Sequence, residues 1–200
     1  MLVGRKKSYD RRDIAARAMR LFWERGYHAT STRNLTDAMG INPYSLYAEF
    51  GSKEALYAAA VAHYEDTVVE RHFGSLETED ASVEQVRAVL DFFGDNGRRE
   101  HSELGCLLCN SGTEQAPTPA HSQAVTQRFI DRLTAAFRNA LTNARLSGAL
   151  ASDAPIEDLA RSFPTVLVGI FVLSRAKVDA AVIRAAADEA LRRLDAVTTA

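Results

Sequence analysis

Apolar residues recur along most of this chain at spacings of three and four positions, and stretches that alternate apolar and polar residues are short. The first spacing keeps side chains on one face of an α-helix, whereas alternation is typical of a strand. In the segment 10–25, for example, Ile14, Ala18 and Phe22 fall on one face, and the arginines lie largely outside it. The pattern therefore predicts an all-α fold.

Capping residues and glycines divide the first part of the chain into short helices. Ser31 or Thr32, Asn42 and Ser52 are good helix N-caps, and Pro43 occupies the favoured first helical position after Asn42. A glycine ends each of the first three segments, as is common at helix C-termini. The first predicted helix covers about residues 10–25, and the second begins after Ser31 or Thr32 and is stopped by Gly40. The third begins at Pro43 and is closed by Gly51, and the fourth continues from Ser52 to about residue 73.

The rest of the chain is also predicted to be helical, with coarser boundaries. Breaks are expected at residues 94–97, around Pro117 and Pro119, and at residues 148–155, where glycine and proline interrupt the helical pattern. The expected helices lie near residues 82–94, 103–114, 120–147, 155–175 and 178–196.

The net charge of −2 conceals an asymmetry along the chain. Residues 1–60 contain 10 Lys and Arg against 6 Asp and Glu, a net charge of +4, which leaves −6 for residues 61–200. A positive first part joined to a negative remainder indicates a nucleic-acid-binding module on a body that does not touch nucleic acid, although a difference of this size also arises by chance.

The composition, with 46% hydrophobic and 25% charged residues, is typical of a globular protein. The longest strongly apolar run, residues 163–173, is far shorter than the ~20 residues that span a bilayer. The N-terminus lacks the apolar core of a secretory signal, so we expect a cytoplasmic protein that does not contact membranes. Two cysteines are too few for a disulfide framework.

Two of the short helices are joined by a tight turn at residues 40–42 and braced by the longer helix before them, which is the geometry of a helix-turn-helix. Specific residues accompany this pattern: Ile14 to Ala18, Leu21-Phe22, Gly26-Tyr27, Thr32, Leu35, Ala38-x-Gly40-Ile41, Leu46-Tyr47-x-x-Phe50 and Ser52-Lys53-Glu54-x-Leu56. With them, the chain resembles the TetR family of transcriptional regulators, of the TetR/AcrR type. The resemblance implies a DNA-binding domain at residues 1–57 and a helical ligand-binding and dimerisation domain at residues 58–200, with about nine helices in all.

The resemblance also implies which residues contact double-stranded operator DNA. A helix N-terminus offers free N–H groups and a positive dipole end to phosphate, and the third helix would enter the major groove. Tyr47 and Lys53 match positions whose hydroxyl and ammonium groups meet the DNA backbone. The expected DNA-binding residues are Arg33, Pro43, Tyr44, Ser45, Tyr47 and Lys53.

Two further charged features of this domain have open interpretations. Arg5, Lys6 and Lys7 form a basic arm that could follow the DNA backbone or enter the minor groove, and the alternative is a solubilising tail. Glu49 could accept a hydrogen bond from a cytosine amino group, but repulsion by phosphates makes a solvent-facing role equally reasonable.

A dimer would present two such domains to two half-sites about one turn of DNA apart. The last two predicted helices have wide apolar faces and small residues such as Gly169 that permit close approach, which resembles the four-helix dimer bundle of the family. The alternative is that these segments are internal core. The residues proposed for the homodimer contact are Ile156, Leu159, Phe163, Val166, Leu167, Ile170, Phe171 and Leu173 on one helix, and Ile183, Ala187, Ala190, Leu191 and Leu194 on the other.

The run from Gly105 to Asn110 resembles the Gly-Cys-Leu-Leu-x-Asn helix of one TetR subgroup, where it borders the ligand cavity. Cys106 and Cys109 fall on roughly one helical face, which suggests redox or electrophile sensing if a thiol is exposed and has a lowered pKa. The alternative is that both are small buried apolar residues. Zinc is disfavoured because no second cysteine pair supplies further ligands.

A ligand pocket is expected among the middle helices, although apolar periodicity alone does not separate a cavity wall from a core face. Asn110, His101 and Arg128 are candidate polar anchors. The mechanism implied by the resemblance is a population shift in which ligand binding turns the fourth helix and moves the two DNA-reading helices out of register. The candidate lining residues are Phe92, Phe93, Leu107, Leu108, Phe129, Leu133, Phe137 and Phe163.

The sequence thus favours a ligand-responsive, sequence-specific DNA-binding regulator, most often a repressor in this family, released by a small molecule or a thiol-reactive compound. It contains no nucleophile elbow, phosphate loop, dinucleotide fingerprint or His-Glu-x-x-His motif, so we expect no enzymatic activity, cofactor or metal. The main alternative is a helix-turn-helix DNA-binding or interaction protein without a small-molecule ligand.

Overall fold

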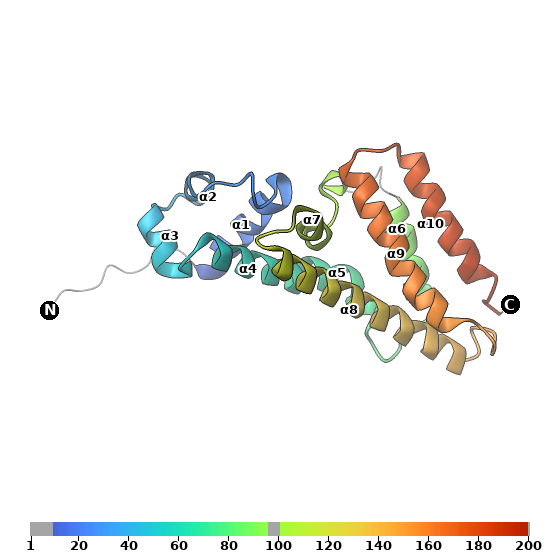
Figure 1. The fold of residues 1–200 in the computed structure, drawn as a ribbon. Coiled ribbons are helices and arrows are strands. Elements are labelled where there is room, and N and C mark those ends of the chain that lie inside the picture. The colour runs from blue at the N-terminus through green and yellow to red at the C-terminus, as the bar shows by residue number, and fades with distance from the viewer. Residues whose placement is uncertain (1–9, 96–100, 200) are drawn as a thin grey trace.

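The computed structural model describes residues 10–95 and 101–199, and within these ranges every regular element is a helix, apart from one isolated β-bridge (Figure 1). The all-α prediction is confirmed. If α4, η1 and α5 are counted as one continuous helix, the described ranges hold nine α-helices. The elements are α1 (Arg11–Arg25), α2 (Thr32–Met39), α3 (Pro43–Phe50), α4 (Lys53–Tyr64), η1 (Glu65–Val69), α5 (Glu70–Phe73), η2 (Gly74–Leu76), α6 (Val83–Gly94), η4 (Ser102–Leu104), α7 (Leu107–Glu114), α8 (Pro119–Leu146), α9 (Ile156–Arg175) and α10 (Ala180–Asp195).

The helices of the N-terminal part begin where their sequence caps predict. The Asn42 side chain accepts a hydrogen bond from the Ser45 N–H at 2.7 Å, and the Ser52 hydroxyl accepts one from the Ala55 N–H at 3.1 Å. Of the two candidate caps for α2, Ser31 is the one used, because it forms a capping box. These bonds satisfy the free N–H groups of each first turn.

The helices α1, α2 and α3 form a head at one end of an elongated molecule, and α4 runs from the head into the body (Figure 1). α1 packs along α4, and the Phe22 ring meets Tyr57 edge-on with ring centroids 4.9 Å apart. The core of the head consists of side chains that are almost completely buried: Ile14, Phe22, Leu35, Leu46, Phe50 and Leu56. This core fixes the orientation of α3 relative to α1.

The fourth helix does not continue regularly to residue 73, as predicted, but contains the π-helical turn η1. In this turn the Glu70 N–H bonds to the Glu65 carbonyl, five residues earlier, and the Thr67 hydroxyl donates to the His63 carbonyl at 2.6 Å. A π turn adds one residue to the helical repeat and so rotates the following side chains. As a result, the residues of α5 face a different direction from the one that a regular α-helix would give them.

The predicted helix 103–114 is also interrupted, because Gly105 separates η4 from α7. Gly105 has φ of 65°, and a Cβ atom at this position would lie 2.7 Å from the Phe171 carbonyl oxygen. Only glycine fits both conditions, so the chain leaves the helix here and passes close to α9. α7 therefore begins at Leu107, with Cys106 as its N-cap residue.

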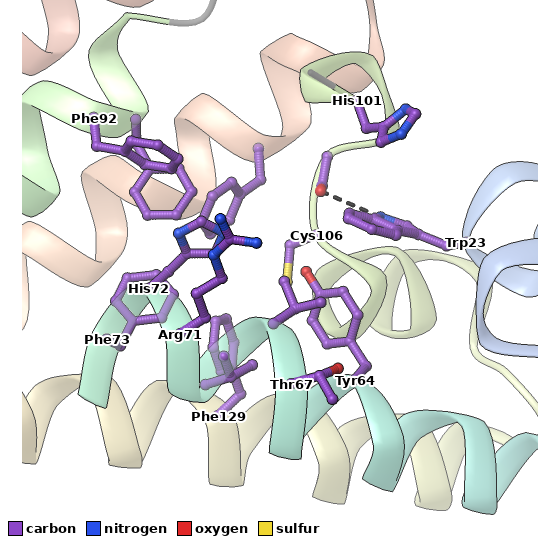
Figure 2. Close-up of a pocket in the computed structure, with 15 residues that line it drawn as sticks. Trp23, Tyr64, Thr67, Arg71, His72, Phe73, Phe92, His101, Cys106 and Phe129 are labelled. Carbon is purple, nitrogen blue, oxygen red and sulfur yellow. Dashed lines mark hydrogen bonds between the residues drawn. The ribbon is translucent and has the colours of Figure 1, made fainter. Parts of the chain in front are cut away.

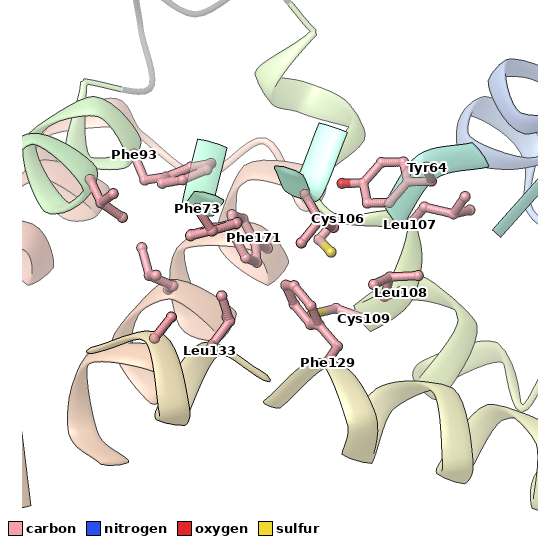
Figure 3. Packing of buried hydrophobic residues seen from close by; sticks show 14 of the residues in the cluster. Tyr64, Phe73, Phe93, Cys106, Leu107, Leu108, Cys109, Phe129, Leu133 and Phe171 are labelled. Atoms are coloured by element: carbon pink, nitrogen blue, oxygen red, sulfur yellow. The ribbon is translucent and has the colours of Figure 1, made fainter. Parts of the chain in front are cut away.

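The body is built from α6 to α10, with α8 and α9 packed against each other and α10 against α6 and α9. Figure 3 shows part of its core, in which Phe73, Phe93, Phe129 and Phe171 meet. The residues predicted for the dimer contact belong to this core: Phe163, Leu167, Ile170, Ile183, Ala187 and Leu194 have no exposed surface within the protomer. Those six residues therefore serve the core of the protomer, whereas Val166 and Leu173 of the same predicted set are only partly buried. The homodimer contact of α9 and α10 stays a prediction.

Candidate nucleic-acid interface and ligand pocket

The N-terminal end of α3 is exposed, with Asn42, Pro43 and Tyr44 at the surface. Pro43 occupies the first helical turn, and the Tyr44 side chain is 84% exposed, which is unusual for an aromatic residue in a small helical unit. The Ser45 N–H bonds to the Asn42 side chain, and Ser45 itself is half-buried. A large exposed aromatic at a helix N-terminus is suited to contact with a phosphate backbone or a groove wall.

Tyr47 and the start of α2 lie next to this surface. The hydroxyl oxygens of Tyr47 and Thr32 share a hydrogen bond of 2.9 Å, and Tyr47 remains 43% exposed. Arg33 follows Thr32, and its exposed guanidinium lies 3.7 Å from the carboxylate of Asp37. An exposed pair of this kind is weak and can exchange for phosphate. The structure thus brings Arg33, Tyr44 and Tyr47 to the surface of the head.

Lys53 is positioned differently from the other predicted DNA-binding residues. Its ammonium donates to the Tyr27 carbonyl at 2.7 Å and lies 4.0 Å from the centre of the Tyr27 ring. Burial lowers the pKa of Lys53, against the opposite effect of the nearby Glu54 and Glu114 carboxylates. An ammonium has three donors, so one internal bond leaves others for a phosphate. Its contact with DNA stays a prediction.

Glu49 has neither of the roles considered from the sequence. Arg11 donates to the Glu49 backbone carbonyl at 2.9 Å and to its carboxylate at 3.3 Å, and the Glu49 side chain is only 10% exposed. Glu49 therefore ties α3 to α1 instead of facing a base or the solvent. The basic arm Arg5, Lys6 and Lys7 lies outside the described residues.

A cavity of about 470 Å³ lies where the head meets the body, and we call it the aromatic pocket (Figure 2). Its size is within the range of small-molecule sites. Phe92, Phe93, Phe129, His101 and Cys106 were among the candidates from the sequence, and the structure brings all five to this pocket. The complete lining is Trp23, Tyr64, Thr67, Val68, Val69, Arg71, His72, Phe73, Phe92, Phe93, His101, Gly105, Cys106, Phe129 and Phe171.

Several candidates from the predicted ligand site do not line the aromatic pocket, and Leu107, Leu108, Leu133 and Phe163 are among them. Phe137 is completely buried and packs on Phe163, with ring centroids 5.5 Å apart, so it belongs to the core. Asn110 does not line the aromatic pocket, because its amide donates to the Leu104 carbonyl at 3.0 Å and braces the turn before α7. Arg128 is exposed on α8, away from the lining.

The two cysteines are both buried but face different spaces. Figure 3 shows both cysteines among buried side chains. Cys106 lines the aromatic pocket, whereas Cys109 lines a more open groove between α7, α8 and α9. Burial raises the pKa of the Cys106 thiol, but hydrogen bonds from Cys109, from the Tyr64 hydroxyl and from the Leu108 backbone outweigh it, so that the pKa lies below its ordinary value. The pKa of Cys109 is raised by its hydrogen bond to Cys106 and by burial. Cys106 is thus the more acidic thiol.

A set of hydrogen bonds that the sequence did not reveal joins the pocket to the head. Trp23 on α1 donates from its indole nitrogen to the Gly105 carbonyl at 3.2 Å (Figure 2). Arg175, the last residue of α9, donates to the backbone carbonyls of Trp23 at 2.8 Å, Leu104 at 3.2 Å and Glu24 at 3.3 Å. We call this set the α1–α9 contact. Its partners are 71 to 152 positions apart in the sequence, so no local pattern indicates it.

The described part of the chain contains neither a candidate metal site nor a helix that could span a membrane. There, no group of three or more His, Cys, Asp or Glu side chains could hold a metal ion. None of the helices in the same ranges is both long and apolar enough to cross a membrane.

Comparisons with known proteins agree with this arrangement. The family model "Bacterial regulatory proteins, tetR family" matches residues 14–60, and "Tetracyclin repressor-like, C-terminal domain" matches residues 82–190. The HTH-type transcriptional repressor ComR of Escherichia coli is 37% identical over 117 residues, which cover 57% of this chain and 55% of ComR. The chain thus spans little more than half of ComR. The uncharacterized HTH-type regulator YezE of Bacillus subtilis is 31% identical over 80% of this chain and 82% of its own length.

Solved structures show the same fold over nearly the whole chain. A cysteine mutant of the TetR family regulator CifR, complexed with a 26-bp operator DNA, has a TM-score of 0.82 at 31% identity and covers 94% of this chain and 98% of its own. Reduced NemR of E. coli has a TM-score of 0.77 at 16% identity, covering 96% and 98%, which is a likeness of fold alone. The second family model alone spans more than half of the 200 residues. The chain therefore belongs to the TetR family of DNA-binding transcriptional regulators.

Proposed function

We propose that this protein is a sequence-specific repressor that acts in the cytoplasm as a homodimer on double-stranded operator DNA and is released by a small molecule or a thiol-reactive compound. The observation that carries the proposal is the exposed surface formed by Arg33, Tyr44 and Tyr47 on a head whose family binds DNA. We propose residues 1–57 as the DNA-binding domain and residues 58–200 as the ligand-binding and dimerisation domain.

The release step is proposed to start in the aromatic pocket. Trp23 belongs both to the pocket lining and to α1, the helix that braces the head. A ligand that displaces its indole changes the α1–α9 contact and with it the orientation of the head on the body. Such a ligand favours the conformation that does not fit two half-sites, and so it lowers the affinity for DNA.

Thiol modification is a second way to reach the same state. We propose that the chain belongs to the TetR subgroup with the Gly-Cys-Leu-Leu-x-Asn segment, and that Cys106 is the reactive residue. Its lowered pKa and its position in the pocket lining support reaction with an electrophile that enters there. The adduct would fill the pocket beside Tyr64, whose hydroxyl interacts with the Cys106 thiol.

The DNA-binding proposal is tested with the DNA upstream of the protein's own gene against scrambled DNA at fixed salt. We expect an affinity ratio of at least about a thousandfold. Arg33→Gln and Tyr47→Phe should each weaken binding and, for Arg33, reduce its salt dependence. Arg145→Gln removes an exposed arginine from the far end of α8 and serves as the matched control.

The outcomes separate the parts of the proposal. A ratio near one would overturn sequence-specific regulation, and loss of the dimer in the Arg33 or Tyr47 variants would overturn the division into two domains. Selective binding that neither small molecules nor a thiol-modifying electrophile affect would instead favour a helix-turn-helix protein without a ligand.

A further inference from the structure

In the part of its lining that the structure describes, the aromatic pocket contains an arginine and no carboxylate. Among its described lining residues, Arg71 is a permanent cation, and none is an aspartate or a glutamate. This contrasts with residues 61–200 as a whole, whose net charge is −6. The absence of carboxylates from the lining is therefore a local feature of the pocket and does not follow from the composition of the body.

Arg71 is the lining residue that is available to bind an anion. It forms no ion pair or hydrogen bond with any residue that the structure describes, although the residue before it on α5, Glu70, is acidic. The nearest carboxylate in the sequence, Glu70, is bonded to Arg132 on α8 at 2.6 Å, and Arg132 also binds Glu77. Glu70 and Glu77 are thus occupied by Arg132, and the guanidinium of Arg71 is left for an external anion.

The π turn explains why Arg71 can reach the pocket. It rotates the residues after Val69, and Figure 2 shows the Arg71 and His72 side chains extending from α5 among the other lining residues. His72 stacks on Phe92, with ring centroids 4.8 Å apart. Arg71 is exposed, so its guanidinium lies at the open side of the pocket, where a bound anion keeps part of its hydration.

The interior of the pocket is apolar by contrast. Phe73 and Phe93 stack with centroids 5.3 Å apart, Phe171 meets Phe93 edge-on at 5.1 Å, and Phe129 meets Phe73 at 6.2 Å. These rings can bury an aromatic or aliphatic body, and each buried CH₂ contributes about 0.8 kcal/mol. The pocket therefore has one cationic end and one apolar end.

From this arrangement we infer that the aromatic pocket binds an organic anion, a carboxylate with an aromatic or extended apolar body, and that Arg71 holds the anionic group. The inference rests on the proposed function, because it names the ligand class of the proposed regulator. The apolar body lies against Phe129 and Phe171, and the carboxylate lies at Arg71. The ligand reaches the wall formed by Trp23, which connects its binding to the head.

The test compares acids with their uncharged amides of the same shape. The chain contains a single tryptophan, Trp23, so its fluorescence reports directly on this pocket. The probes are 3-phenylpropanoate with 3-phenylpropanamide, and octanoate with octanamide. For the wild-type protein we expect saturable changes in Trp23 emission and a Kd at least about tenfold lower for each acid than for its amide.

Variants assign the preference to one residue. In Arg71→Gln the acid and its amide should bind with nearly equal affinity, whereas Arg71→Lys should keep part of the preference because it keeps the charge. Arg128→Gln removes an exposed arginine from α8 outside the pocket and should leave the tenfold preference unchanged. Arg71 is itself exposed, so we expect these variants to fold, which thermal unfolding checks.

Each result supports or overturns the inference. Equal affinity of acids and amides for the wild-type protein, no effect of either acid at millimolar concentration, or an acid preference that survives in Arg71→Gln would overturn it. Because the fluorescence experiment contains no DNA, it is independent of the proposed function. Binding of the acids without selective DNA binding would refute only the proposal that the protein is a DNA-binding regulator. Selective DNA binding without a preference for acids over amides would refute only the proposal that the ligand is an organic anion.

Discussion

At the scale of single residues, the two cysteines differ chemically although they are three positions apart. Hydrogen bonds from Cys109 and Tyr64 lower the pKa of Cys106 despite its burial, and the bond to Cys106 raises the pKa of Cys109. The thiolate is the reactive form, so we expect Cys106 to be alkylated first near neutral pH. Cys109→Ala removes one donor, raises the pKa of Cys106 and should slow its alkylation several-fold at pH 7.

Mass spectrometry after timed reaction with iodoacetamide, repeated across a range of pH, measures this effect. Because the pKa of Cys106 rises in Cys109→Ala, the pH profile of its alkylation rate should move to higher pH. At a pH where Cys106 is ionised in both the wild-type protein and the variant, it should react at similar rates in the two. In Cys106→Ala, the hydrogen bond that raises the pKa of Cys109 is lost, so Cys109 should react faster than it does in the wild-type protein, although burial still slows it. Equal rates for both cysteines in the wild-type protein would contradict the assigned pKa order.

At the scale of elements, the α1–α9 contact joins the end of the body's central helix to the end of the head's bracing helix. Arg175→Met keeps an apolar stem of similar length but removes the donors to the carbonyls of Trp23 and Glu24. We expect the free energy of unfolding to fall by about 1 to 3 kcal/mol. We also expect ligand to bind the pocket but release DNA less completely, because the connection to the head is weakened.

Denaturant unfolding measures the first effect, and DNA binding with and without ligand measures the second. Arg145→Met is the matched control, since Arg145 is exposed on α8 far from α1. A variant of Arg175 with unchanged stability and complete release of DNA would show that coupling runs through another route.

Which elements the sequence could predict depends on how local their causes are. The helix caps are local, because Ser31, Asn42 and Ser52 each bond to a residue three positions away. Such a pattern can be recognised in the sequence. The break at Gly105 depends on the nearby carbonyl of Phe171, which is remote in the sequence, and was missed. The π turn was missed because an apolar pattern does not record one extra residue in a turn.

The same reasoning applies to the candidate site. Apolar periodicity reports burial but not whether a cavity lies beyond the side chain, so Phe129 and Phe137 looked alike, although only Phe129 lines the pocket. Arg71 was overlooked because a charged residue on a predicted regular helix is usually solvated. The head was easier to predict, because its exposed aromatic Tyr44 follows a capped turn in a short, continuous motif.

At the scale of the whole molecule, selective binding to an operator requires two heads, and therefore a dimer. The dimer contact must use a surface that is not already buried in the core of the protomer. The wide apolar stripes of α9 and α10 are buried within the protomer. What these helices leave exposed is narrower: Gly169 and Val172 lie one turn apart on α9, and Val182 lies on α10. Small residues on such a face permit two helix pairs to approach closely.

Gly169→Arg tests this surface without disturbing the protomer. No atom lies within 4 Å of a Cβ placed at Gly169, and glycine is a poor helix former, so the substitution should preserve or slightly increase helicity. Between two copies, however, a long charged side chain would hold the helices apart. We expect sedimentation to show a monomer with unchanged circular dichroism, and an operator affinity reduced by more than about tenfold because the two heads are no longer linked. Ala62→Arg, at an exposed position on α4, should remain dimeric, and a dimeric Gly169→Arg would place the interface on another face of the body.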